Sequence, residues 1–217
     1  MIETTTNAGL HDYVMEQVRR RVKPSQSAVD LGAGPGALSA RLRDLGLEAT
    51  AVDINSSGYK ADLPFVQVDL NEQDFASHLG PGTFGLVTAV EVLEHVESPI
   101  NFLRNIARLL KPDGVAIITT PNVDSVPARV KFLWAGKIRM MDEHSEPTHI
   151  SPIFWDLFQR QYLPRSRLQL VDHLLFPPHG YQLTRTRLAL ALRPLKWVLG
   201  GECLEGDNHV FVLQPQG

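Results

Sequence analysis

The feature that most constrains this 217-residue sequence is a glycine-rich turn between a short apolar run and a stretch with helical spacing. Residues 27–31 are mostly apolar, and Gly32, Gly34 and Gly36 follow at alternate positions. Glycine lets the backbone approach a ligand closely, because no Cβ stands in the way. The turn also fits the dinucleotide pattern G-x-G-x-x-[GA] through Gly32, Gly34 and Ala37. The sequence therefore predicts a strand, a tight turn and a helix that together bind a ligand.

Apolar runs alternate with helical spacings along the first 125 residues. Strands are predicted at residues 27–31, 49–53, 64–68, 84–90 and 114–120, with helical patterns between them. A Lys-Pro-Asp-Gly string at 111–114 predicts a helix stop and a turn. Such alternation is typical of an α/β fold with a parallel sheet and helices on both faces.

The regular alternation of predicted strands and helices ends after Pro121. Residues 122–152 are predicted to form an insertion that acts as a substrate lid, since long insertions in compact domains are usually functional. The remaining elements are predicted as a helix at 151–162, a strand at 167–176, a basic amphipathic helix at 183–199 and a last strand at 208–213. The whole chain, 1–217, is expected to be a single domain.

Three carboxylates stand at or near the ends of the first three predicted strands. Asp30 lies two residues before the first glycine, where a semi-buried carboxylate needs a hydrogen-bonding or cationic partner, such as an amino-acid ammonium group. Asp53 ends the second strand and can accept both hydroxyls of a ribose. Asp69 follows the third strand and could meet an adenine amino group.

On these residues the chain resembles the class I S-adenosylmethionine-dependent methyltransferases. Residues 30–36 are similar to their first motif, Asp53 to their ribose-binding acid, and Asp69-Leu70 to their adenine-edge pair. The resemblance implies a Rossmann-like, seven-stranded, mostly parallel sheet with helices on both faces and an antiparallel last strand. It also implies S-adenosyl-L-methionine as cofactor and S-adenosyl-L-homocysteine as product. The implied cofactor-binding residues are Asp30, Gly32, Ala33, Gly34, Gly36, Asp53, Ile54, Asp69, Leu70, Val90 and Glu91.

An E-x-x-E-H segment follows the fourth predicted strand. If a helix begins near Glu91, then Glu91, Glu94 and His95 share one face and could hold Mg²⁺ or Mn²⁺. The segment resembles quinone-biosynthesis O-methyltransferases and small-RNA 3′-end 2′-O-methyltransferases, and in the latter resemblance His149 would complete the metal site. The alternative needs no metal: Glu91 lines the cofactor pocket, while Glu94 and His95 cap and pack the helix start.

His149 and His95 are the candidate catalytic residues, because an imidazole titrates near neutrality and can serve as a general base. His144 lies in the same insertion and is a weaker candidate. The other histidines show no partner pattern and are interpreted as structural: His11, His78, His173, His179 and His209.

The composition of the chain excludes several classes of binding partner and site. A net charge of −3 argues against a general nucleic-acid binder. One cysteine excludes a disulfide framework and a multi-cysteine zinc site, and the N-terminal residues lack a signal-peptide pattern, so a cytoplasmic location is expected. Residues 126–141 interleave basic and aromatic side chains, which predicts either a lid with peripheral membrane contact or an ordinary solvated cationic face.

The predicted activity is O-methylation of a small, carrier-linked, lipid-linked or glycan-linked acceptor. One alternative is a metal-dependent RNA 3′-end 2′-O-methyltransferase. Others are a non-catalytic cofactor-binding adaptor and an NAD-dependent dehydrogenase, since Asp53 would serve a dinucleotide too. The sequence makes no prediction of oligomeric state.

Overall fold

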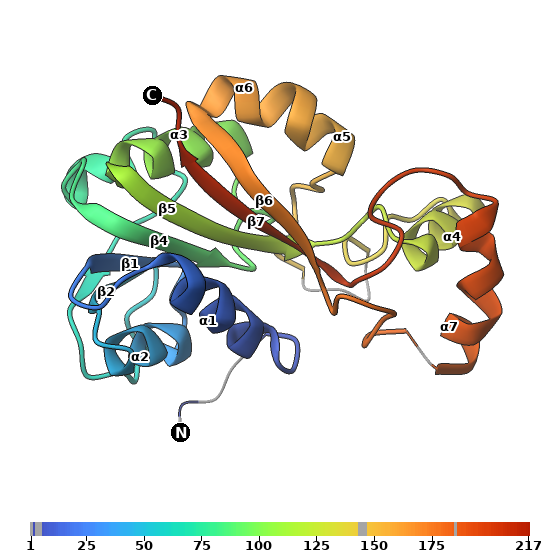
Figure 1. Ribbon diagram of the computed structural model, residues 1–217, viewed down its shortest axis with the longest axis horizontal. Coiled ribbons are helices and arrows are strands. Elements are labelled where there is room, and N and C mark those ends of the chain that lie inside the picture. The colour runs from blue at the N-terminus through green and yellow to red at the C-terminus, as the bar shows by residue number, and fades with distance from the viewer. Residues whose placement is uncertain (1, 3–5, 143–146, 185) are drawn as a thin grey trace.

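The computed structural model describes residues 2, 6–142, 147–184 and 186–217. A seven-stranded sheet forms its centre, in the order β3-β2-β1-β4-β5-β7-β6 (Figure 1). β7 is antiparallel to both of its neighbours, and the pairings among the first five strands are all parallel. The strands are β1 Ser27–Leu31, β2 Glu48–Asp53, β3 Phe65–Gln67, β4 Phe84–Val90, β5 Leu110–Pro121, β6 Leu168–Phe176 and β7 Asn208–Pro215. The predicted fold class and antiparallel last strand are confirmed.

Helices cover both faces of the sheet (Figure 1). On one face α1 and α2 bury leucine and valine side chains against β1 and β2. Val210 and Val212 of β7 belong to the same core, because alternate residues of a strand point to the same face of the sheet. On the other face α3 and the segment 155–166 enclose a core that contains Phe102, Phe158 and Phe211. The helices are α1 Leu10–Arg21, α2 Ala37–Asp44, α3 Pro99–Leu109, α4 Val126–Ala135, α5 Trp155–Leu157, α6 Leu163–Ser166 and α7 Thr186–Leu192.

α4 and α7 stand beyond the edge of the sheet to which β5 points (Figure 1). With the segments that join them to β5, β6 and β7, they form what we call the outer lobe. The predicted insertion at 122–152 supplies α4 and part of this lobe. None of the helices in the described ranges is long and apolar enough to cross a bilayer.

Two predicted helices differ from the structure. The helix expected at 151–162 begins at Trp155, because residues 150 and 151 turn back to donate their N–H groups to the carbonyl of Glu94. It continues through a π-helical turn and α6 to Ser166. The helix expected at 183–199 is shorter: α7 ends at Leu192, and a 3₁₀ turn that contains Pro194 follows.

The predicted turn at 111–114 is also wrong. α3 ends at Leu109 and β5 begins at the next residue, so Asp113 and Gly114 lie within the strand. The register between β4 and β5 shifts between Phe84 and Leu86, which accommodates the additional residues as a bulge.

Candidate active site

The glycine turn follows β1 at the carboxyl edge of the sheet, where open α/β sheets bind their ligands. Gly32 has a φ of 69°, and a Cβ at this position would lie 2.5 Å from Cγ2 of Val92. A larger residue would therefore have to move Val92. At Gly34, φ is 51° and a Cβ would meet nothing within 4 Å, so this side of the turn is open.

Asp53 ties the end of β2 to the glycine turn. The amide of Gly34 donates a hydrogen bond of 2.8 Å to Oδ2 of Asp53, and the amide of Asn55 donates one of 3.0 Å to Oδ1. Each carboxylate oxygen retains acceptor capacity, since it can receive more than one donor. Asp53 is thus held rigidly with its oxygens available at the cleft.

A cavity of about 270 Å³ opens beside this pair. Seven of the predicted site residues line it together: Gly32, Asp53, Ile54, Asp69, Leu70, Glu91 and His95. Asn71 and Val92 complete the lining, although no motif had pointed to them. Residues separated by up to 63 positions in the chain, from Gly32 to His95, therefore converge on one cleft.

A narrower cavity of about 40 Å³ lies on the other side of Gly32. It is lined by the predicted Asp30, Ala33, Gly34 and Val90, and by residues of the N-terminal segment and α1, including Thr6 and His11. Burial, with a smaller contribution from the Arg41 charge, lowers the pKa of His11 to about 4, so its ring is neutral. His11 was interpreted as structural, whereas the fold places it at this cavity. Gly36 lines neither cavity and instead packs against Tyr59.

Asp30 has two hydroxyl partners within the protein. Ser39 Oγ donates to Oδ2 at 2.6 Å and Thr88 Oγ1 donates to Oδ1 at 2.7 Å. Burial outweighs these hydrogen bonds and raises the pKa of Asp30 to about 6. The Asp30 carboxyl group therefore does not require an external ammonium group as its partner, because Ser39 and Thr88 already supply hydrogen bonds.

The E-x-x-E-H segment does not form a helix. Glu91 has a φ of 57°, which is not a helical value. Its N–H donates to the carbonyl and hydroxyl oxygens of Thr119 on β5, so this residue ends the pairing of β4 with β5 and does not begin a helix. The next helix begins at Pro99 after a Ser98 cap. The prediction that Glu91, Glu94 and His95 share a helix face is wrong.

Glu91 and Glu94 are nevertheless close enough to influence each other. Burial raises the pKa of Glu91, and burial followed by the nearby Glu91 charge raises that of Glu94 well above its ordinary value. Asn208 donates to Oε1 of Glu91. Neither carboxyl oxygen of Glu94 has a hydrogen-bond partner within the described ranges, although the side chain is fully buried.

Three of the four predicted metal ligands lie together. One carboxyl oxygen of Glu94 and one ring nitrogen each of His95 and His149 lie within 4.8 Å of one another, and Glu91 lies outside this group. The carbonyl of Met140 lies 2.7 Å from His149 Nδ1, and that of Thr148 lies 3.1 Å from His95 Nδ1. These contacts orient both rings, whose centroids are 4.6 Å apart. His144 lies outside the described residues.

Comparison with known proteins decides the family. The family model of the methyltransferase domain matches residues 7–170. The chain belongs to the methyltransferase domain family. Its resemblance to the class I S-adenosylmethionine-dependent methyltransferases is thereby confirmed.

Named relatives fit this assignment. The ubiquinone biosynthesis O-methyltransferase of Xanthomonas campestris pv. campestris (strain B100) is 37% identical over 119 residues, which cover 51% of this chain and 48% of that protein. This methyltransferase thus spans about half the length of the curated relatives that it matches.

Solved structures share the fold. A SAM-dependent methyltransferase from Archaeoglobus fulgidus superposes with a TM-score of 0.61 at 15% identity, over 94% of both chains. The 1,6-didemethyltoxoflavin-N1-methyltransferase of Burkholderia thailandensis, solved with S-adenosylhomocysteine, gives 0.62 at 15% identity, over 95% of this chain and 78% of that one.

The outer lobe of this methyltransferase holds an apolar cavity of about 310 Å³. Its lining includes Ala128, Phe132, Ile138 and Phe154, and its charged members are Asp124 and Arg129. The cavity lies at the same edge of the sheet as the 270 Å³ cleft beside Asp53, because α4 follows closely on the end of β5.

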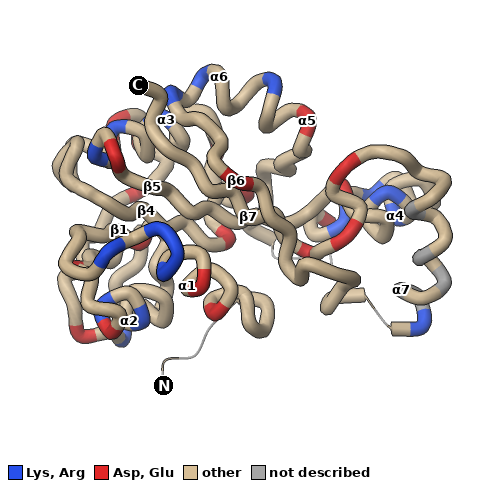
Figure 2. The backbone as a smooth tube through the Cα atoms, in the orientation of Figure 1, with Lys and Arg blue, Asp and Glu red and all other residues tan. Residues whose placement is uncertain are grey.

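Three of the four basic side chains of residues 126–141 have partners within the protein. Arg129 donates to the backbone carbonyls of Asp124, Gly200 and Glu202, Lys131 pairs with Asp142, and Arg139 pairs with Asp207 at 3.0 Å. In Figure 2, the basic positions near α4 accordingly lie among acidic ones. The expectation of an open cationic face does not hold for these three residues. Trp134, in contrast, is 92% exposed.

Proposed function

We propose that this methyltransferase binds S-adenosyl-L-methionine in the 270 Å³ cleft, with the ribose hydroxyls on Asp53 and the adenine beside Asp69 and Leu70. The observation that carries the proposal is the bond from the Gly34 amide to Asp53, which joins the glycine turn to a carboxylate of ribose-binding type. Ile54 and Glu91 would form the walls of the adenosine site. The methionine part would extend past Gly32 toward Asp30, Ala33, Gly34 and Val90.

The reaction that we propose is a direct displacement. An acceptor oxygen attacks the sulfonium methyl carbon, a C–O bond forms, the S–CH₃ bond breaks, and S-adenosyl-L-homocysteine leaves. The acceptor must lie about 3 Å from the methyl carbon and in line with that bond. The acceptor proton passes to a base, for which His95 and His149 are our candidates, because His95 lines the cleft and His149 contacts its ring.

As the alternative to a histidine base, we propose that Glu94, His95 and His149 hold a divalent cation, since an imidazole bound to the metal cannot also accept the proton. A buried carboxyl group without a hydrogen-bond partner, placed beside two oriented imidazoles, fits such a site. With Glu91 outside the group, the donor set is richer in nitrogen than the expected Mg²⁺ site and suits Mn²⁺ better. A bound cation would lower the pKa of an acceptor hydroxyl.

The acceptor that we propose is a small or carrier-linked molecule with an apolar part. The names of the relatives, ubiquinone biosynthesis O-methyltransferases, favour a small or lipid-linked acceptor. The apolar cavity of the outer lobe could receive such a group, and the exposed Trp134 could contact a membrane that carries it.

Three alternatives remain useful as experimental controls. An RNA 3′-end substrate is disfavoured by the acidic net charge, and RNA serves as a competing acceptor in the assay. An adaptor would bind the cofactor without turnover. An NAD-dependent dehydrogenase has lost its support through the family assignment, so NAD serves as the control ligand.

The deciding experiment is calorimetric titration with S-adenosyl-L-homocysteine and, in parallel, with NAD. We expect binding of the first ligand alone. Asp53→Asn should weaken it by about 10- to 100-fold, because hydrogen bonds to a charged group contribute roughly 1.5–3 kcal/mol. The matched control is Asp62→Asn, whose side chain is exposed in the loop after β2.

Turnover is then measured as transfer of a labelled methyl group from S-adenosyl-L-methionine to a catechol probe. Binding without transfer to any oxygen acceptor would favour the adaptor. Transfer to RNA in preference to the catechol would replace the acceptor that we propose.

A further inference from the structure

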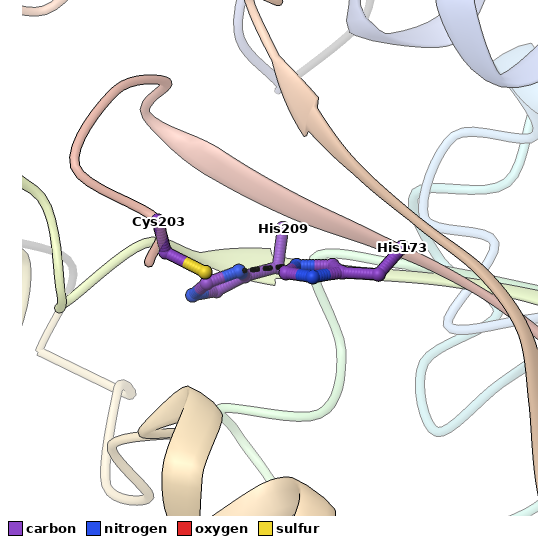
Figure 3. Close-up of side chains that lie close together, drawn as sticks. All are labelled: His173, Cys203 and His209. Atoms are coloured by element: carbon purple, nitrogen blue, oxygen red, sulfur yellow. Dashed lines mark hydrogen bonds between the residues drawn. The ribbon is translucent and has the colours of Figure 1, made fainter. Parts of the chain in front are cut away.

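A second cluster of ligand-type side chains lies outside the cofactor cleft (Figure 3). His173 comes from β6, His209 from β7, and Cys203 from the segment that leads into β7. One nitrogen of each histidine and the sulfur of Cys203 all lie within 4.8 Å of one another. His209 is fully buried and Cys203 is 7% exposed, so this cluster is part of the interior.

The spacing is close to that of a tetrahedral zinc site. With Zn–N bonds of about 2.0–2.1 Å and Zn–S bonds of about 2.3 Å, neighbouring ligand atoms lie roughly 3.3–3.7 Å apart. Here Nε2 of His173 and Nδ1 of His209 are 3.0 Å apart. The sulfur of Cys203 lies within 4.8 Å of the ligand nitrogens, so a small adjustment of these side chains would bring all three atoms to zinc-binding distances.

Asp124 stands where zinc sites place a supporting carboxylate. Its Oδ2 lies 3.8 Å from Nε2 of His209, the ring nitrogen that points away from His173. This nitrogen is buried and has no hydrogen-bond partner among the residues described. Histidines that bind a metal through one nitrogen commonly direct the other toward a carboxylate, which sets the tautomer.

The surroundings hold these groups in position. Trp155 stacks on His173 with ring centroids 3.8 Å apart, and its backbone N–H donates to Oδ2 of Asp124 at 2.8 Å. Its indole N–H bonds to Glu202, the residue before Cys203.

We propose that His173, Cys203 and His209 bind one Zn²⁺ ion, with Asp124 supporting His209 from outside the ligand sphere. Cys203 binds as the thiolate, and its proton passes to solvent when the metal enters. The ion joins β6 and β7 to the segment that enters from α7, and through Asp124 to the segment that leads into α4. The site is thus a structural tie between the sheet and the outer lobe, and it does not depend on the proposed methyl transfer.

The test uses the full chain, stripped of metal by a chelator and titrated with Co²⁺ as a spectroscopic substitute for Zn²⁺. Because Cys203 is the sole cysteine, a thiolate-to-cobalt charge-transfer band can arise only from this residue. We expect a charge-transfer band that saturates when one Co²⁺ per chain is bound through Cys203, separate from any Co²⁺ held by Glu94, His95 and His149, and displacement of this band by Zn²⁺. Cys203→Ser and His173→Gln should abolish the band, and Asp124→Asn should weaken Zn²⁺ binding by about 10- to 100-fold.

His149→Gln is the matched control, because it removes a histidine from the other candidate metal cluster. It should leave the charge-transfer band unchanged. Circular dichroism checks that the variants fold, and protection of the thiol from a disulfide reagent by Zn²⁺ provides a readout in the unmodified chain. No charge-transfer band and no thiol protection in the unmodified chain would overturn the proposal, as would retention of the band in a folded His173→Gln variant.

Discussion

Asn208, the first residue of β7, donates a hydrogen bond from Nδ2 to Oε1 of Glu91, 117 positions earlier at the end of β4. The same amide accepts a bond of 2.7 Å from Asn7 on its oxygen. One amide group thereby connects the N-terminal segment, the antiparallel strand and the wall of the cofactor cleft. A polar side chain is needed at position 208, because an apolar residue there would leave Asn7 and Glu91 without these hydrogen bonds.

Asn208→Ala is expected to destabilise the protein by about 1–3 kcal/mol, because a buried acceptor and a donor lose their partners. Burial raises the pKa of Glu91 to about 7, while the Asn208 bond lowers it, so this bond stabilises the ionised form. The loss should therefore be larger at pH 8 than at pH 5.5. Urea unfolding at both pH values measures it. In a Glu91→Gln background the pH dependence should vanish, and a persisting difference would contradict this explanation.

Asp30→Asn is expected to stabilise the protein near neutral pH while weakening cofactor binding. The folded-state pKa of Asp30 is raised to about 6 from 3.8, so the favourable protonated form is fully present below about pH 3.8 and is lost as the pH rises through 6. The gain from Asn should therefore grow over this window, to roughly 3 kcal/mol above pH 6. Thermal unfolding from pH 4 to pH 7.5 measures it. Asp44→Asn, at an exposed position, should give no such trend, and a flat response in Asp30→Asn would refute the prediction.

Gly32→Ala should cost more stability than Gly34→Ala. Both positions have positive φ, for which a non-glycine residue costs about 1–2 kcal/mol. Only at Gly32 does a Cβ collide with another side chain, Val92, which adds about 1–3 kcal/mol of overpacking. Chemical denaturation of both variants gives the difference. Val92→Ala should reduce the cost of Gly32→Ala, and equal costs in the two single variants would show that the contact is unimportant.

His149→Gln should reduce methyl transfer to the catechol probe by about 100-fold or more if His149 serves as base or metal ligand. The rate should also lose any dependence on added Mn²⁺. His78→Gln is the control, because His78 pairs with Glu72 at the surface and does not line the cleft. A His149→Gln variant with a lower melting temperature but unchanged methyl transfer would assign the residue a packing role.

Local patterns predicted much of this fold. Each of the seven strands appears within a few residues of its predicted range, because period-two and apolar runs are properties of adjacent residues. The placement of Asp53 and Asp69 at one cleft followed from the rule that parallel strands end at a common edge. The helix expected at Glu91 is absent because of a contact between two strands. The N–H of Glu91 binds Thr119 on the neighbouring strand, and no local pattern around Glu91 reveals that choice.

Local patterns do not predict which side chains meet when strands from distant parts of the chain pair in the sheet. Asn208 meets Glu91, and His173 meets His209, because β7 runs antiparallel between β5 and β6 and brings residues from distant parts of the chain within reach of one another. Cys203 joins them through the path of the segment that precedes β7. Adjacent residues determine strand, turn and helix through backbone geometry, and so the glycine turn and the α/β class could be read directly from the chain. The partners of buried polar groups are determined by how the sheet is assembled. A buried polar group without a hydrogen bond costs free energy, so it pairs with the groups that the assembled strands bring into contact with it.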